Sequence, residues 1–205
     1  MIALGFLIVS AVCVSAQSTG QKATQVRVDK KAEAVFGPLL VTIGGKETKI
    51  SDDAQQAWII NDGQQVVYSS SKGSGGYENE GQSLHLYDVG TGKEKRIMSE
   101  YYMVDDVKEA VTSNKKRALL VTMSDGGLGA SYVAVVDPWR GEVFFRHWAR
   151  ILSHKGDTIV LGRYREGDWA NIDEQGAKVR PYRRESYNLN LLLKRRVIVN
   201  KRYPE

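Results

Sequence analysis

Residues 57–97, AWIINDGQQVVYSSSKGSGGYENEGQSLHLYDVGTGKEKRI, contain the pattern that decides the fold class of this chain. Short stretches rich in Val, Ile, Leu and Tyr alternate with clusters of Asn, Asp, Gly and Ser, and apolar spacing of helical period is not sustained. Each apolar stretch has the length of a β-strand, and each polar interruption has the composition of a turn. The segment therefore predicts a meander of four strands, with a tight turn, a variable loop and a second tight turn between them.

The same order of strands and turns recurs in residues 110–148. In both copies the third strand ends in an aspartate, Asp88 or Asp137, and a glycine, Gly92 or Gly141, follows four residues later. An aspartate at this place accepts hydrogen bonds from the next backbone N–H groups, and the glycine provides the left-handed residue of a type I turn with a bulge. Units of this length with four strands are typical of propeller blades.

A more divergent third copy occupies residues 149–182, where Asp173 precedes Gly176 by one residue less, so we expect a different turn there. Residues 39–50 predict a hairpin around Gly44-Gly45. Residues 187–193 and 197–199 predict two more strands around a basic turn. We therefore expect an all-β fold, a propeller-like stack of antiparallel β-meanders, in which the two terminal hairpins form a fourth blade closed by both termini. An open twisted sheet or a sandwich built from the same hairpins is the alternative.

The first unit also resembles a known family. INDGQQVVYSS (residues 60–70) followed by LHLYDVGTGKEKRI (residues 84–97) is similar to the blades of exported TolB-like and WD-repeat-like propellers. The second copy departs from the pattern, since Asn114-Lys115 stands where Asp-Gly is expected. The resemblance covers residues 57–182, and it implies recognition of a protein partner, because such proteins generally bind other proteins or sit beside a hydrolase domain. The matching residues are Asp62, Gly63, Val67, Tyr68, Leu86, Tyr87, Asp88 and Gly92.

Residues 1–16, MIALGFLIVSAVCVSA, contain no charged side chain. The apolar run is shorter than the about 20 residues of a membrane-spanning helix, and it ends in small residues before polar Gln17. We predict a signal peptide cleaved near Ala16/Gln17, and hence a secreted or periplasmic protein. Residues 17–35 are expected to be a flexible lead-in, and residues 36–205 a single propeller-like domain.

Cys13 is the one cysteine of the chain, and it lies inside the predicted signal peptide. A lipid-bearing cysteine usually follows a small residue, whereas Val12 precedes this one, so we favour a signal that is simply cleaved and keep lipidation of Cys13 as the alternative. The exported chain would then have no thiol, and its stability would come from its core alone.

Positive charge is concentrated in the last third of the chain. Residues 17–138 contain 14 Lys and Arg against 16 Asp and Glu, whereas residues 139–205 contain 15 against 8. Such an excess can attract a polyanion or an envelope surface, although a solvated strand face with a tight basic turn is the interpretation that we favour. The export signal argues against nucleic acid. The candidate contacts are Arg183, Arg184, Arg195 and Arg196.

No recognisable catalytic, metal or cofactor motif is found in the sequence. Ser74 lies between glycines without the G-x-S-x-G spacing of a nucleophile elbow. The three histidines lack the spacing of zinc ligands, and the acidic pairs Asp52-Asp53 and Asp105-Asp106 are better explained as turn caps. The glycine-rich residues 124–131 lack the pattern of a phosphate loop. We predict no catalytic residue, metal or cofactor.

The abundance of tyrosine and tryptophan favours binding, because these side chains anchor protein interfaces. We expect Tyr77 and Trp139 to contact a partner, with residues 72–81 and 124–131 as contact loops. The leading hypothesis is therefore an exported, non-enzymatic binding or scaffold module for a protein partner. The alternatives are a hydrolase of an extracellular polymer, with carboxylates from separate blades, and polyanion or envelope-surface binding by the basic C-terminal strands.

Overall fold

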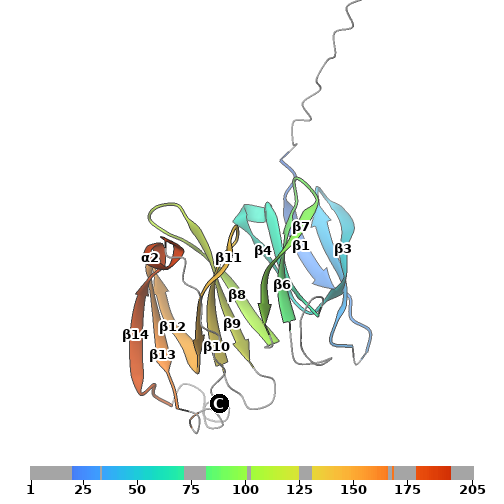
Figure 1. The fold of residues 1–205 in the computed structure, drawn as a ribbon. Coiled ribbons are helices and arrows are strands. Elements are labelled where there is room, and N and C mark those ends of the chain that lie inside the picture. The colour runs from blue at the N-terminus through green and yellow to red at the C-terminus, as the bar shows by residue number, and fades with distance from the viewer. Residues whose placement is uncertain are drawn as a thin grey trace, which may run out of the picture.

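The computed structural model describes residues 20–32, 34–71, 82–100, 103–124, 131–165, 168 and 179–194 (Figure 1). Over these residues the protein is all-β, as predicted, with one 3-10 turn and one short helix. The elements are β1 (Ala23–Val28), β2 (Gly37–Ile43), β3 (Lys46–Ala54), β4 (Ala57–Ile60), η1 (Asn61–Gly63), β5 (Gln65–Ser70), β6 (Gln82–Asp88), β7 (Lys93–Glu100), β8 (Met103–Val111), β9 (Arg117–Ser124), β10 (Ser131–Asp137), β11 (Gly141–His147), β12 (Ala149–Lys155), β13 (Thr158–Arg163), β14 (Arg183–Asn188) and α2 (Leu189–Lys194).

The strands form four antiparallel sheets, each built from consecutive strands. Sheet 1 contains β1–β3, sheet 2 contains β4–β7, sheet 3 contains β8–β11, and sheet 4 has the order β12-β13-β14. Sheets 2 and 3 correspond to the first two units of the sequence, so the predicted four-stranded meanders are confirmed. In the third unit, β12 and β13 are joined by β14, whereas Asp173 and Gly176 lie outside the described residues.

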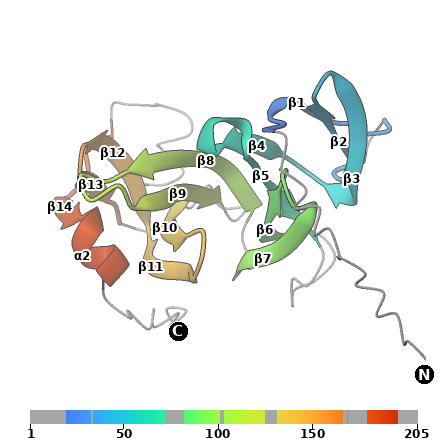
Figure 2. The same ribbon diagram turned by 90° about the horizontal axis from the view of Figure 1, so that it is seen from above.

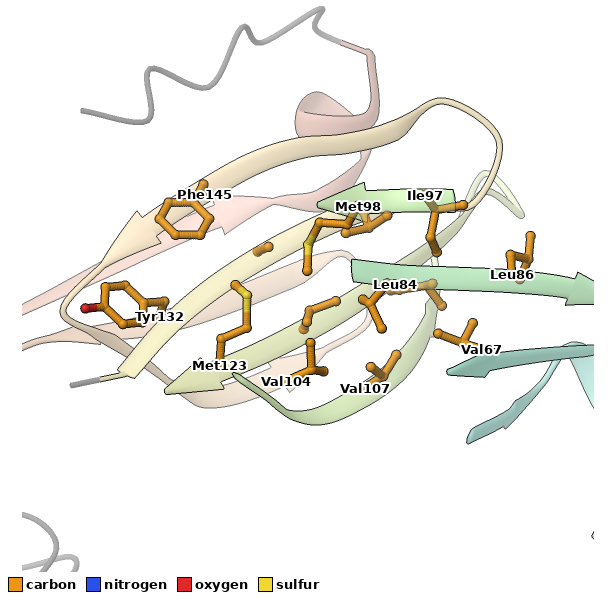
Figure 3. Close-up of a cluster of buried hydrophobic side chains, with 14 of the residues drawn as sticks. Val67, Leu84, Leu86, Ile97, Met98, Val104, Val107, Met123, Tyr132 and Phe145 are labelled. Atoms are coloured by element: carbon orange, nitrogen blue, oxygen red, sulfur yellow. The ribbon is translucent and has the colours of Figure 1, made fainter. Parts of the chain in front are cut away.

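The four sheets are stacked in a row, with sheets 1 and 4 at its two ends (Figures 1 and 2). One hydrophobic core fills each interface between neighbouring sheets. Between sheets 2 and 3, Leu84 and Met98 lie beside Val104 and Met123 (Figure 3). Because both faces of the middle sheets are covered, all residues of β5 and of β10 are buried. This explains why residues 66–68 and 132–136 within them are continuous apolar runs instead of alternating ones.

Among the described strands, the two ends of the chain do not share a sheet, so the predicted blade closed by both termini is not found there. In the structure β1 pairs with β2 at one end of the row, and β14 pairs with β13 at the other. The hairpin around Gly44 and Gly45 is present, with both glycines at positive φ, but it completes sheet 1 together with β1. β1 lies within the segment predicted to be a flexible lead-in, so part of that segment is ordered as a strand.

The strand predicted at residues 187–193 is wrong, because β14 ends at Asn188 and α2 follows. Leu189, Leu192 and Leu193 are spaced three and one residues apart, which places them on one face of a helix, and all three are buried in the core between sheets 3 and 4. The Asn188 side chain accepts a hydrogen bond from the Leu191 N–H (3.1 Å) and so caps the helix. Residues 197–199 lie outside the described residues.

The row of sheets has two different edges (Figure 1). The tight-turn edge contains α2 and the short connections β4–β5, β6–β7, β8–β9, β10–β11 and β12–β13. The long-loop edge is the opposite one, where the chain leaves β5, β9 and β13. The Glu109 carboxylate near the end of β8 accepts a hydrogen bond from the Asn61 N–H (2.8 Å), which places the first turns of sheets 2 and 3 side by side.

The predicted corners at the tight-turn edge are confirmed. Asp88 accepts hydrogen bonds from the backbone and the hydroxyl of Thr91 (2.9 and 2.8 Å), and Gly92 has a φ of 66°. The equivalent Asp137 accepts from the Trp139 N–H (2.8 Å), and Gly141 has a φ of 92°. These hydrogen bonds lower the pKa of Asp88, against the opposing effect of burial.

Candidate anion-binding groove

The β8–β9 turn supplies two lysines to the surface of the tight-turn edge. Its backbone is closed by hydrogen bonds from the Lys115 N–H to the Thr112 carbonyl and from the Thr112 N–H to the Lys116 carbonyl (both 2.8 Å). Lys115 adopts a φ of 56°, the left-handed conformation that a glycine would provide at this place. Both lysine side chains are exposed.

The β10–β11 turn supplies an aromatic ring beside them. Trp139 is 71% exposed, and the Lys95 ammonium lies 5.0 Å from the centre of its ring, within the range of a cation–π contact. The Asp137 carboxylate accepts hydrogen bonds from the Trp139 N–H and from the Arg140 Nε (2.7 Å). The negative charge of Asp137 is thus compensated by hydrogen-bond donors of its own turn, while the tryptophan ring is exposed to solvent.

The end of α2 forms the third side of the site. The Arg140 guanidinium donates a hydrogen bond to the Leu193 carbonyl, which joins the β10–β11 turn to α2. The Asp157 carboxylate accepts from the Ser113 N–H (2.6 Å) and from Asn190 Nδ2 (2.7 Å), which joins the β8–β9 turn to the same helix. The hydroxyl and the backbone N–H of Ser113 hold the pKa of Asp157 below its usual value.

These three elements enclose a groove of about 510 Å³. Glu109 and Gln65 already hold the Arg117 guanidinium. Within the described part of the chain, no ion pair engages the ammonium groups of Lys115, Lys116 or Lys194. The groove is therefore positively charged beside an exposed aromatic ring, an arrangement suited to an anionic ligand. Its lining residues are Lys115, Lys116, Arg117, Asp137, Trp139, Arg140, Leu193 and Lys194.

The structure brings one of the predicted binding residues, Trp139, into this groove. Arg183 and Arg184 are exposed at the start of β14, which lies at the long-loop edge, and Arg183 Nε is 3.5 Å from Glu185. The sequence predicts a basic binding surface around those arginines, and it does not predict a role for the lysines of the β8–β9 turn. Tyr77, Arg195 and Arg196 lie outside the described residues, as do residues 72–81 and 125–130 of the predicted contact loops.

A second groove, of about 620 Å³, lies between β8–β9 and β12 and is lined by Asp105, Asp106, Arg150 and His154, among others. The two neighbouring carboxylates line the same groove, although regular strand geometry would turn them apart, because a register shift interrupts β8 between Val104 and Asp106. Among the described residues, no three His, Cys, Asp or Glu side chains are grouped to hold a metal ion.

A buried chain of hydrogen bonds in sheet 2 has the order of a serine hydrolase triad. Ser83 Oγ lies 2.9 Å from His85 Nε2, and His85 Nδ1 lies 2.8 Å from Glu94 Oε1. An ionised glutamate only accepts, so Nδ1 donates to it, while the Ser83 hydroxyl is also within hydrogen-bond distance of the Ser70 carbonyl oxygen (3.2 Å). The Ser83 side chain is wholly buried, however, so the chain satisfies buried polar groups instead of presenting a nucleophile.

This buried chain could have been found partly from the sequence. Ser83 and His85 are two residues apart on one strand, and therefore share a face. Tyr68 stacks on the His85 ring with 5.2 Å between ring centres, and burial raises the pKa of the Tyr68 hydroxyl. The contribution of Glu94 depends on strand register, which residue spacing did not reveal.

The part of the chain that the structure describes contains no helix long and apolar enough to span a bilayer. No protein-family model matches the sequence, and no curated protein matches it. A solved structure described as the β-propeller domain of the Trilobed protease from Pyrococcus furiosus, with an open velcro topology, is similar to this chain. Its sequence identity is 11% and its TM-score 0.47.

The similarity covers 67% of this chain and 43% of that one, so this chain spans less than half the length of the similar structure. The description of the fold as propeller-like is carried by the four stacked meanders themselves. The comparisons do not identify the TolB-like or WD-repeat family, and that resemblance stays an interpretation of the sequence.

Proposed function

We propose that this protein is an exported, non-enzymatic binding module whose tight-turn edge recognises an anionic partner. The observation that carries the proposal is the basic groove, in which five cationic side chains surround one carboxylate. That carboxylate, Asp137, is bonded to Arg140 and to the backbone of its own turn, so it does not neutralise the lysines. Three lysine ammonium groups are left to attract negative charge from outside.

The experiment compares equal losses of charge at the two edges. Lys115→Gln with Lys116→Gln removes two positive charges from the groove, and Arg183→Gln with Arg184→Gln removes two from the long-loop edge. Binding to heparin and to polyglutamate is measured by calorimetry at several salt concentrations. We expect the lysine pair to weaken binding by about tenfold or more and the arginine pair to have little effect. An equal loss of affinity in the two variants would show that net charge, and not the groove, determines binding.

The leading sequence hypothesis, a protein partner held by the loops, concerns the long-loop edge. Val104 pairs with Met123, and its N–H donates to the Gln82 side chain (2.9 Å). Gln82 follows residues 72–81, and Ser124 next to Met123 precedes residues 125–130, so the two predicted contact loops attach close together on neighbouring sheets. This closeness favours one shared surface for a protein partner.

Deletion of residues 73–80 tests this second candidate. A tagged chain is used to isolate partners from the envelope and from the culture fluid, with the lysine pair variant as the matched control. We expect the deletion to release a partner that the lysine pair variant retains. A set of partners unchanged by the deletion would eliminate the loop as the contact.

A further inference from the structure

Exposed apolar side chains gather at the tight-turn edge together with the lysines. Val111 is 56% exposed at the end of β8, Leu191 is 54% exposed on α2, and Trp139 is 71% exposed. Two contacts keep them at one place. Ser113, just beyond Val111, accepts a hydrogen bond from the Asn190 side chain (3.2 Å), and Arg140, next to Trp139, donates to the Leu193 carbonyl.

We propose that this edge docks onto an anionic phospholipid bilayer, with the three apolar side chains entering the head-group region. This inference rests on the proposed function, because it identifies the anionic partner of the same groove. The ammonium groups of Lys115, Lys116 and Lys194 contact the phosphates of the lipids. A surface of exposed apolar side chains surrounded by lysines binds membranes through both apolar burial and attraction to anionic lipid.

The chemistry of the cations favours a lipid surface over a folded acidic protein. The arginines of the groove, whose planar groups bind carboxylates in pairs of hydrogen bonds, are already held: Arg117 by Glu109, and Arg140 by Asp137 and the Leu193 carbonyl. The groups left over are lysines, which act as point charges on flexible stems. Such groups suit a layer of mobile phosphates, and an exposed tryptophan suits the interface between lipid and water.

The experiment uses the chain as isolated after export, with the same N-terminus in every variant. Cosedimentation is measured with vesicles of phosphatidylglycerol and phosphatidylcholine in equal parts, and with vesicles of phosphatidylcholine alone. We expect binding to the anionic vesicles only, weakened about fivefold for each lysine removed and about 30-fold by Lys115→Gln with Lys116→Gln. Trp139→Ala is expected to weaken binding about tenfold. The matched control, Arg183→Gln with Arg184→Gln, keeps the binding of the unchanged chain.

Each other outcome overturns the proposal in a distinguishable way. Binding to heparin or polyglutamate through the same lysines, without binding to vesicles, overturns the lipid as partner and leaves the proposed function standing. An absence of binding to all of these probes overturns both. Equal binding of every variant to vesicles shows that the N-terminal segment, and not this edge, holds the chain to lipid.

Discussion

The corners of the tight-turn edge and the contacts of the long-loop edge are held by hydrogen bonds of different range. At the tight-turn edge, hydrogen bonds between residues two or three apart close the corners. Asp88 accepts from the Thr91 N–H, and Asp137 accepts from the Trp139 N–H. The hydrogen bonds between sheets, at the long-loop edge as in the groove, instead join distant parts of the chain. The Gln82 side chain, for example, bonds both Gln55 and the Val104 N–H. Hydrogen bonds within a turn can be predicted from neighbouring residues, whereas hydrogen bonds between distant residues depend on how the sheets are stacked.

The largest difference between the edges is expected for two matched glutamine substitutions. Gln82 is 2% exposed, and its truncation in Gln82→Ala leaves Gln55 and the Val104 N–H without their partner. We expect a loss of about 4 kcal/mol in the free energy of unfolding, from two unsatisfied buried groups and a cavity. The Gln64 side chain at the tight-turn edge is exposed and accepts a hydrogen bond from the Asn61 side chain, so Gln64→Ala should cost less than about 0.5 kcal/mol.

Urea denaturation of the two variants at the same pH gives both values. A comparable loss for both would mean that the long-range hydrogen bonds of the long-loop edge do not stabilise the stack, and the comparison between the edges would fail.

Gly141 and Gly92 test how far the corners of the tight-turn edge are equivalent. Both have positive φ, so alanine strains the backbone at either place by about 1 kcal/mol. A Cβ at Gly141 would also lie 3.0 Å from the Ile97 carbonyl oxygen of sheet 2, whereas at Gly92 the nearest atom is 3.8 Å away. We expect Gly141→Ala to cost about 3 kcal/mol and Gly92→Ala about 1 kcal/mol.

Thermal unfolding followed by circular dichroism measures this difference. Equal shifts of the unfolding midpoint would show that the corner of sheet 3 is not pressed against sheet 2 and that only the local turn determines the cost.

The contrast between the edges also explains what the sequence could predict. The corners of Asp88 and Asp137 and the four-stranded meanders were predictable, because each depends on residues close together in the chain. The sequence did not reveal that β1 pairs with β2 at one end of the row and β14 with β13 at the other, since edge pairing is decided by the whole stack. α2 was mistaken for a strand because its leucines are equally apolar in either conformation, and only burial against sheet 3 selects the helix.

The candidate site follows the same division. Trp139 was predicted from its turn, which is local. The groove as a whole was not, because it needs the β8–β9 turn, the β10–β11 turn and α2 to meet. Lys115 and Lys194 are far apart in the sequence, and no spacing rule connects them.

A buried carboxylate beside the β10–β11 corner gives the tight-turn edge a pH dependence. Burial raises the pKa of Glu142 to about 7, above its ordinary value of 4.5. The folded state therefore binds the proton more tightly than the unfolded state, and the stabilisation is complete below pH 4.5 and is lost as the pH rises to about 7. Glu142→Gln should raise the free energy of unfolding at pH 8 by on the order of 2 kcal/mol, with much less effect at pH 4.

Urea titrations of this variant and of the unchanged chain, repeated from pH 4 to pH 8, show how the free energy of unfolding of each changes with pH. Parallel curves over this range would show that Glu142 titrates normally and that its surroundings are open to water.

The smallest effect is expected at the buried serine of sheet 2, where it also tests the hydrolase alternative. Ser83→Ala removes one partner of His85 but leaves its hydrogen bond to Glu94 and its stacking on Tyr68, so we expect a loss of about 1 kcal/mol in unfolding free energy. A fluorophosphonate probe, which labels activated serines, should not label the unchanged chain, because the Ser83 hydroxyl has no access to solvent. Labelling that disappears in Ser83→Ala would instead mean that the long-loop edge opens to expose a working Ser–His–Glu site, and it would turn this edge from a binding surface into a catalytic one.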